Sequence, residues 1–62
     1  MIDAQTLASF THYRRKHQNL TPSKLARKLK IPVSQIYACE EGKRIGTIAR
    51  AALIKFNELE EV

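Results

Sequence analysis

The sequence predicts an all-α fold, a small bundle of four to five helices, from three observations. Residues that favour helix N-caps precede segments in which apolar side chains recur every three or four positions. Pro and Gly fall between these segments, where they end helices. The 62 residues, 44% hydrophobic and 27% charged, have the composition of one folded globular domain, which we expect to span residues 1–62.

The first helix is predicted to begin after Asp3, which is a suitable N-cap. Leu7 and Phe10 define an apolar stripe that continues towards His17 at the other end. Basic residues in the last turn favour a helix C-terminus. Asn19 follows, and because Asn tolerates the left-handed conformation it is expected to end the helix.

The second helix is predicted to begin cleanly after Thr21, a good N-cap. Pro22 then occupies the first helical position, where its missing N–H costs nothing. Leu25, Ala26 and Leu29 form a short apolar stripe on this helix. The small side chain of Ala26 invites the close approach of another helix.

Pro32 separates the second helix from a third, which is predicted over residues 33–41 and capped by Gly42. At about 100° per residue, Ile36 and Cys39 fall on one face, which we expect to be core. The opposite face is expected to be free and carries Val33, Ser34, Tyr37, Ala38 and Glu41.

A basic loop over residues 43–46 leads to a fourth helix, with Thr47 as its expected N-cap and an end near Glu60. Ile54 is expected to point away from the core. A strand in this region is the alternative, but the Ala-rich, Glu-ended pattern favours a helix. The expected buried stripe comprises Ile48, Ala49, Ala52, Leu53, Phe56 and Leu59.

The composition argues against several classes of protein. No run approaches the roughly 18 apolar residues of a membrane span, and a signal-peptide pattern is lacking, so we expect a cytoplasmic protein. One cysteine and two histidines are too few for a disulfide or a structural zinc site, and Cys39 is expected to pack in the core. Because no serine has an associated histidine and acid, we expect no catalytic residue and no enzyme activity. We also expect no metal, no cofactor and no small-molecule substrate.

The charge is concentrated around the second and third helices. Residues 14–50 hold ten Lys or Arg against only Glu40 and Glu41, within a chain of net charge +5. Such a charge fits a polyanionic partner, and nucleic acid is favoured over a membrane because no basic amphipathic helix with aromatic anchors is present. Two short helices joined by a tight turn, over residues 20–42, also predict a helix-turn-helix.

These residues resemble the helix-turn-helix domains of the Cro and phage-repressor type, also called the xenobiotic-response-element class and lambda-repressor-like. The resemblance rests on residues 20–42, where several constraints meet at matching spacing, and with the flanking helices it covers nearly the whole chain. It departs from the family in having Pro22 for a phosphate-contacting Gln, Lys30 for the turn glycine and Pro32 for a capping Ser or Thr. The matching residues are Leu20, Thr21, Leu25, Ala26, Ile31, Ile36, Glu40, Glu41 and Gly42.

The resemblance implies that the third helix lies in the DNA major groove. The family's base-reading positions fall on Val33, Ser34, Tyr37 and Ala38. None of these is an Arg, Asn or Gln capable of bidentate base contacts, so we expect moderate specificity from methyl contacts, hydroxyls and DNA shape. Cations are expected to supply most of the affinity. The candidate phosphate contacts are Lys43, Arg44, Lys24, Arg27, Lys28, Lys30 and Arg14.

In the family, an arginine late in the first helix pairs with the glutamate near the end of the recognition helix. The resemblance places Arg14 opposite Glu40, with Arg15 as the alternative partner. A partly buried, bidentate pair of this kind would orient two helices and help to present the arginine to a phosphate.

The expected function is therefore that of a sequence-specific, double-stranded DNA-binding transcriptional regulator of phage or bacterial type, such as a repressor. It would occupy a two-fold operator, with a homodimer forming on the DNA. Ile54 and Val62 are candidates for a dimer contact, although Ile54 also reads as a lone exposed aliphatic residue. Two alternatives stay open: a protein-interaction module such as an antitoxin or adaptor subunit, and a non-specific nucleic-acid binder.

Overall fold

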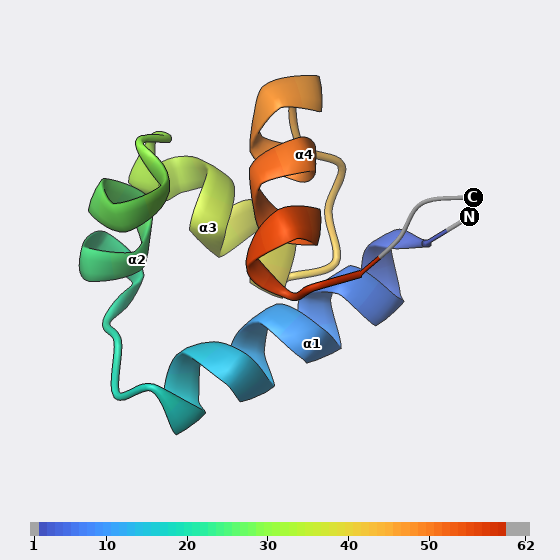
Figure 1. Ribbon diagram of the computed structural model, residues 1–62. Coiled ribbons are helices and arrows are strands. Elements are labelled where there is room, and N and C mark those ends of the chain that lie inside the picture. Colours follow the sequence, from blue (N-terminus) through green and yellow to red (C-terminus); the bar gives the residue numbers. More distant parts are fainter. Residues whose placement is uncertain (1, 60–62) are drawn as a thin grey trace.

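The computed structural model describes residues 2–59, and within this range it contains four α-helices and no strand (Figure 1). The α3 helix contacts both α1 and α2, and α4 closes the bundle by packing against α1 and α2. The predicted all-α class is confirmed, and the segment that begins at Thr47 is a helix rather than a strand. The helices are α1 (Ala4–His17), α2 (Pro22–Leu29), α3 (Val33–Glu40) and α4 (Thr47–Phe56).

The hydrophobic core lies where the four helices meet, and every helix contributes to it. Leu25, Ile36 and Leu53 are completely buried, each worth roughly 1.5–3 kcal/mol relative to an exposed side chain. The predicted inward faces of α2 and α3 are therefore confirmed. The buried core residues are Leu7, Leu25, Ala26, Ile31, Ile36, Cys39, Ala49 and Leu53.

In the first half of the chain, N-cap side chains and a left-handed residue determine where the helices begin and end. The Asp3 carboxylate accepts a hydrogen bond of 2.7 Å from the Thr6 N–H, which lowers the pKa of Asp3. The Thr21 hydroxyl accepts one of 3.2 Å from the Lys24 N–H. Asn19 takes the left-handed conformation at φ 57°. These three predictions are confirmed.

Three residues turn the chain between α2 and α3. Lys30 ends α2 in the left-handed conformation, with φ 59°, and the Ile31 N–H then donates to the Ala26 carbonyl at 3.0 Å. Pro32 is extended and precedes α3. Beyond α3, Gly42 is left-handed as well, with φ 76°. Lys30 and Pro32 thus separate α2 from α3, and the predicted break at Pro32 is confirmed.

The predicted stripe on α1 is wrong in part. Phe10 is 47% exposed and His17 is exposed, whereas Thr11 and Arg15 are buried beside Leu7. The sequence pattern misleads because two polar side chains lie on the inward face, where each finds hydrogen-bond partners that compensate its burial.

The prediction for α4 needs three corrections. Gly46, not Thr47, is the N-cap, because the Gln35 side chain accepts the Gly46 N–H at 2.9 Å and so holds the helix start. Ile48 is 81% exposed, whereas Ile54 is half-buried and packs against the core, since α4 presents Ala49 and Leu53 inwards.

The C-terminal end of α4 also differs from the prediction. The helix ends at Phe56 because Asn57 caps it and Glu58 turns left-handed at φ 55°. The expected end at Glu60 and the Val62 dimer contact concern positions outside the described residues. Ile54 reaches the core side, so the predicted dimer contact through an outward-pointing Ile54 is not supported.

Candidate nucleic-acid interface

The α3 helix has one buried and one exposed face. Ile36 and Cys39 are inward, at 0% and 2% exposure, whereas Val33, Ser34 and Tyr37 are exposed. Of the four predicted base-reading residues, Ala38 differs because it is half-buried. The exposed face therefore offers an aliphatic group and two hydroxyls, and lacks a guanidinium or carboxamide.

The N-terminus of α3 has no side-chain cap, since Pro32 occupies the N-cap position and has no suitable side-chain acceptor. The Gln35 N–H bonds to the Pro32 carbonyl at 3.0 Å. The N–H groups of Val33 and Ser34 precede that of Gln35 and lie at the positive end of the helix dipole. Such a helix end favours an anionic oxygen.

The predicted phosphate-contacting cations lie on more than one side of the molecule. Lys28 lies over the Phe56 ring, with Nζ 5.8 Å from the centroid, and Arg14 pairs with Glu58 at 3.2 Å. Lys28 is thereby turned towards α4, and Arg14 towards the residues that follow it. Successive residues of a helix are about 100° apart, so Arg27 lies on another side of α2 from Lys28. Six of the predicted cations are exposed, namely Lys24, Arg27, Lys28, Lys30, Lys43 and Arg44, and Arg14 is half-buried.

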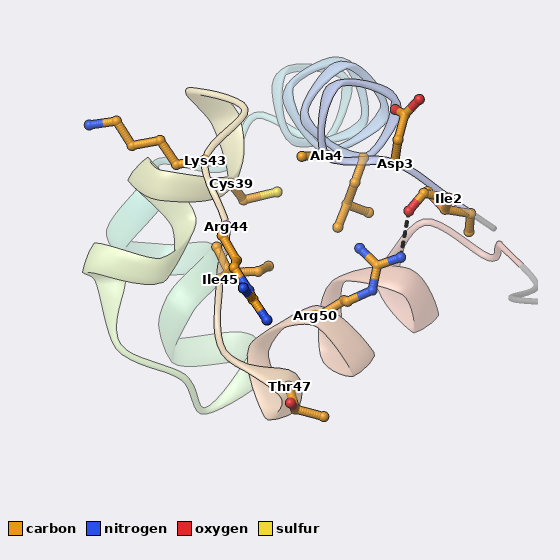
Figure 2. A pocket seen from close by; sticks show the side chains of 10 residues that line it. Ile2, Asp3, Ala4, Cys39, Lys43, Arg44, Ile45, Thr47 and Arg50 are labelled. Atoms are coloured by element: carbon orange, nitrogen blue, oxygen red, sulfur yellow. Dashed lines mark hydrogen bonds between the residues drawn. The ribbon is translucent and has the colours of Figure 1, made fainter.

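Two neighbouring cations in the loop after α3 point in different directions. Lys43 extends outwards from the molecule and pairs with Glu41 at 3.3 Å (Figure 2). Arg44 instead turns towards a pocket between this loop and α4, in which Arg50 also lies. Of this pair, Lys43 is the side chain presented to the outside.

Glu40 pairs with Arg15 and not with Arg14, so the predicted Arg14–Glu40 pair is wrong and the alternative partner is correct. Arg15 Nε lies 2.7 Å from Glu40 Oε2, and Arg15 Nη2 lies 2.9 Å from Oε1. Arg15 Nη1 also donates to the Leu20 carbonyl at 2.9 Å. One guanidinium thus joins α1, α3 and the chain before α2.

The electrostatics of this pair stabilise the charged forms. Burial by itself would raise the pKa of Glu40, but hydrogen bonds from Arg15 and His12 outweigh it and lower that pKa. The same Glu40 carboxylate raises the pKa of Arg15. His12 contributes through Nδ1, which lies 2.8 Å from Glu40 Oε1, while most of its ring stays exposed.

A buried polar cluster behind α3 was missed from the sequence. Asn57 Nδ2 donates to Thr11 Oγ1 and to the Leu53 carbonyl, both at 2.9 Å, and the Cys39 thiol lies 3.6 Å from the same Thr11 oxygen. Burial raises the pKa of Cys39, so the predicted core role of this cysteine is confirmed. The one sequence signal at Asn57 is that an Asn after an apolar helical segment commonly ends a helix. That signal does not predict a buried hydrogen bond to Thr11.

Between residues 2 and 59 no group of three or more His, Cys, Asp or Glu is arranged to hold a metal ion. Over the same residues, no helix has both the length and the apolar character that a membrane crossing needs. Comparisons of the chain with protein-family models, with curated proteins and with solved structures found no match. The proposed function therefore rests on the chain's own residues and geometry.

Proposed function

We propose that this protein is a sequence-specific, double-stranded DNA-binding transcriptional regulator of the Cro or repressor type, with α2 and α3 as a helix-turn-helix. The observation that carries the proposal is the two-sided character of α3. Its inward face is locked in the core by Ile36 and Cys39, while its outward face and its uncapped N-terminus are exposed in a basic chain. A rigidly held, outward-facing helix of this kind suits the major groove, which is about 12 Å wide.

In this proposal the base contacts come from the exposed face of α3. Val33 packs against a thymine methyl, and the hydroxyls of Ser34 and Tyr37 bond to base edges. Ala38 is half-buried and contributes less. Because these contacts are few, DNA shape supplies part of the specificity.

Phosphate contacts in this proposal come from the cations that are not turned towards α4. Lys24, Arg27 and Lys30 on α2 and its turn, with Lys43 after α3, supply the charge. The N–H groups at the start of α3 add donors for a phosphate oxygen. Arg15, paired with Glu40, holds α3 against α1, so the recognition face is positioned rigidly.

We further propose that two copies occupy a two-fold operator, with half-sites about 34 Å apart. The chain measures 28 × 21 × 18 Å, so two copies at this spacing meet only at their edges. Such a contact is small, and a dimer of this kind forms on the DNA rather than in free solution.

Selection of bound duplexes from a random pool tests this function. We expect one enriched sequence with two half-sites, bound by two copies at saturation. Single-base variants of that sequence should then be titrated against Ser34→Ala and Tyr37→Ala, and each substitution should relax discrimination at one position by about 1 kcal/mol or more. Ser9→Ala and Tyr13→Ala, the same changes at exposed positions of α1, serve as matched controls and should leave discrimination unchanged.

The result distinguishes the rival functions. An unenriched pool with salt-sensitive binding would indicate a non-specific nucleic-acid binder. Absence of DNA binding would favour a protein-interaction module such as an antitoxin or adaptor subunit. One specific observation supports that second candidate: Phe10 and Tyr13 are exposed on the outer side of α1, where aromatic residues suit a protein contact.

A further inference from the structure

The outer face of α1 carries aromatic side chains that the fold does not bury. Tyr13 is 71% exposed and Phe10 is 47% exposed. The Tyr13 ring stacks on His17, with 6.0 Å between the ring centroids and 10° between the ring planes. A pocket of about 220 Å³ is lined by these three rings together with Arg14 and Gln18. A cluster of exposed aromatic groups is typical of protein interaction sites.

This outer face is directed away from α3. Arg15 marks the side of α1 that meets α3, because its guanidinium bonds to Glu40. Thr11 marks the side that meets the end of α4, because its hydroxyl accepts a hydrogen bond from Asn57. Tyr13 is two residues from Arg15 and from Thr11, so at about 100° per residue it lies on the opposite side of the helix. The inference therefore goes beyond the proposed function and does not depend on it.

The charge of α1 favours an acidic partner. Residues 4–17 contain two arginines and a lysine but no Asp or Glu. Both arginines pair with glutamates from α3 and from the segment after α4. Lys16 is exposed and forms no ion pair with any other residue that the structure describes. It lies three positions from Tyr13, where side chains on a helix are neighbours, so a positive charge borders the aromatic cluster.

Two other occupants fit this face less well. A second copy would bring a further net charge of +5 and set Lys16 against an α1 helix that has no acid. A nucleic acid base would stack on an aromatic ring, but His17 already covers one side of the Tyr13 ring. Phe10, Tyr13 and His17 instead follow the spacing of three, four and seven positions with which one helix packs against another.

We propose that the outer face of α1 binds an acidic amphipathic helix of a partner protein. The apolar side of that helix packs against Phe10 and Tyr13 and places one side chain in the pocket beside His17. Its carboxylates lie near Lys16. Because the contact is on the side of α1 that is opposite to Arg15, the exposed face of α3 stays uncovered.

The experiment is a titration of the whole isotope-labelled chain with a synthetic amphipathic helical peptide, which has leucine along one face and glutamate elsewhere. Saturable NMR shifts are expected at the backbone amides of residues 9–18. A peptide with lysine in place of glutamate should bind at least about ten-fold more weakly, as should a peptide of unchanged composition whose leucines are spread around the helix. Equal binding of the lysine peptide would overturn the role of charge, and equal binding of the rearranged peptide would overturn the helical contact.

Paired substitutions locate the contact. Tyr13→Ala should weaken peptide binding about ten-fold, whereas Tyr37→Ala, which removes an exposed tyrosine from α3, should change it less than about two-fold. Both tyrosines are exposed, so neither change should disturb the fold. Lys16→Gln should weaken binding about three-fold, and Lys55→Gln, the same change on the exposed side of α4, should leave it unchanged. Equal effects of the two tyrosine variants, or shifts that never saturate, would overturn the proposal.

Two further measurements test the other occupants. Sedimentation of the free chain should show no self-association through this face, and oligothymidylate should bind the amides of residues 9–18 more weakly than the acidic peptide does. Self-association that Tyr13→Ala abolishes would assign the face to a second copy, and tighter binding of oligothymidylate would assign it to single-stranded nucleic acid. None of these measurements contains duplex DNA, so this proposal and the proposed function can fail separately.

Discussion

Arg15 shows how one residue can hold three parts of the chain together. It lies on the inward face of α1 with 9% exposure, and its guanidinium bonds to Glu40 in α3 and to the Leu20 carbonyl before α2. Because a buried charge without a partner is costly, the fold depends on Glu40 remaining ionised. Arg14, one position earlier, points towards Glu58 instead.

Glu40→Gln should therefore lower the free energy of unfolding by about 3 kcal/mol at pH 7, since the neutral amide leaves Arg15 without its counter-charge. The pKa of Glu40 is lowered in the folded state, so this stabilisation is complete above its ordinary pKa of 4.5 and is lost as the pH falls through the lowered value. Urea unfolding of the natural protein and of Glu40→Gln should be compared between pH 7 and pH 3. The difference between their free energies of unfolding should shrink below pH 4.5.

The matched control is Glu58→Gln, which breaks the exposed ion pair with Arg14. A surface pair contributes less than about 1 kcal/mol, so this variant should unfold nearly as the natural protein does. A loss from Glu40→Gln no larger than that from Glu58→Gln would contradict the role assigned to the Arg15–Glu40 pair.

At the scale of the elements, the ends of α2 and α3 depend on left-handed residues. Gly42 adopts φ 76° at no steric cost, whereas Lys30 adopts φ 59° with a side chain. The strain at Lys30 is tolerated because the following Ile31 is buried in the core and its N–H bonds back to α2.

Reciprocal substitutions test this difference between the two turns. Lys30→Gly should raise the free energy of unfolding by about 0.5–1 kcal/mol, because the left-handed strain is removed. Gly42→Ala should lower it by about 1 kcal/mol, because alanine at φ 76° carries the left-handed strain, whereas the nearby end of the exposed Gln5 side chain can move aside. Thermal unfolding followed by circular dichroism measures both changes, and a loss of stability in Lys30→Gly would contradict the explanation.

For the whole molecule, the dominant feature is a net charge of +5 on a body only 28 Å long. The cations do not all point the same way. Arg14 pairs with Glu58 and Lys28 lies over Phe56, whereas Lys43 extends outwards from the loop after α3. The proposed DNA complex uses only some of these cations as phosphate contacts. The number of contacts determines how strongly the DNA affinity depends on salt concentration.

The logarithm of the DNA affinity should fall linearly with the logarithm of salt concentration, with a slope of about 0.9 for each phosphate contacted. Arg27→Gln should reduce that slope by about one and weaken binding to all sequences alike. Lys55→Gln removes an equal charge from the exposed side of α4 and should leave the slope unchanged. Fluorescence anisotropy at several salt concentrations measures these slopes, and equal changes for the two variants would show that only net charge matters.

Much of the fold could be predicted from the sequence because its signals are local. Thr21 before Pro22, Asn19 after α1 and Pro32 before α3 determine helix ends through contacts within about four residues and through steric limits on the backbone. The apolar spacing of Leu25 and Ala26, like that of Ile36 and Cys39, determined which faces of α2 and α3 are buried. The exposure of Val33, Ser34 and Tyr37 follows from the same periodicity.

Only the tertiary structure decided which charged and polar side chains enter the core. Glu40 pairs with Arg15, 25 residues away, because the orientation of α1 about its own axis turns Arg15 towards α3. Spacing along the sequence could not decide between Arg14 and Arg15. The same kind of orientation leaves Ile48 exposed on α4 and Ile54 half-buried against the core. Caps and periodicity act along one helix, whereas the rotation of each helix is set by the packing of all four.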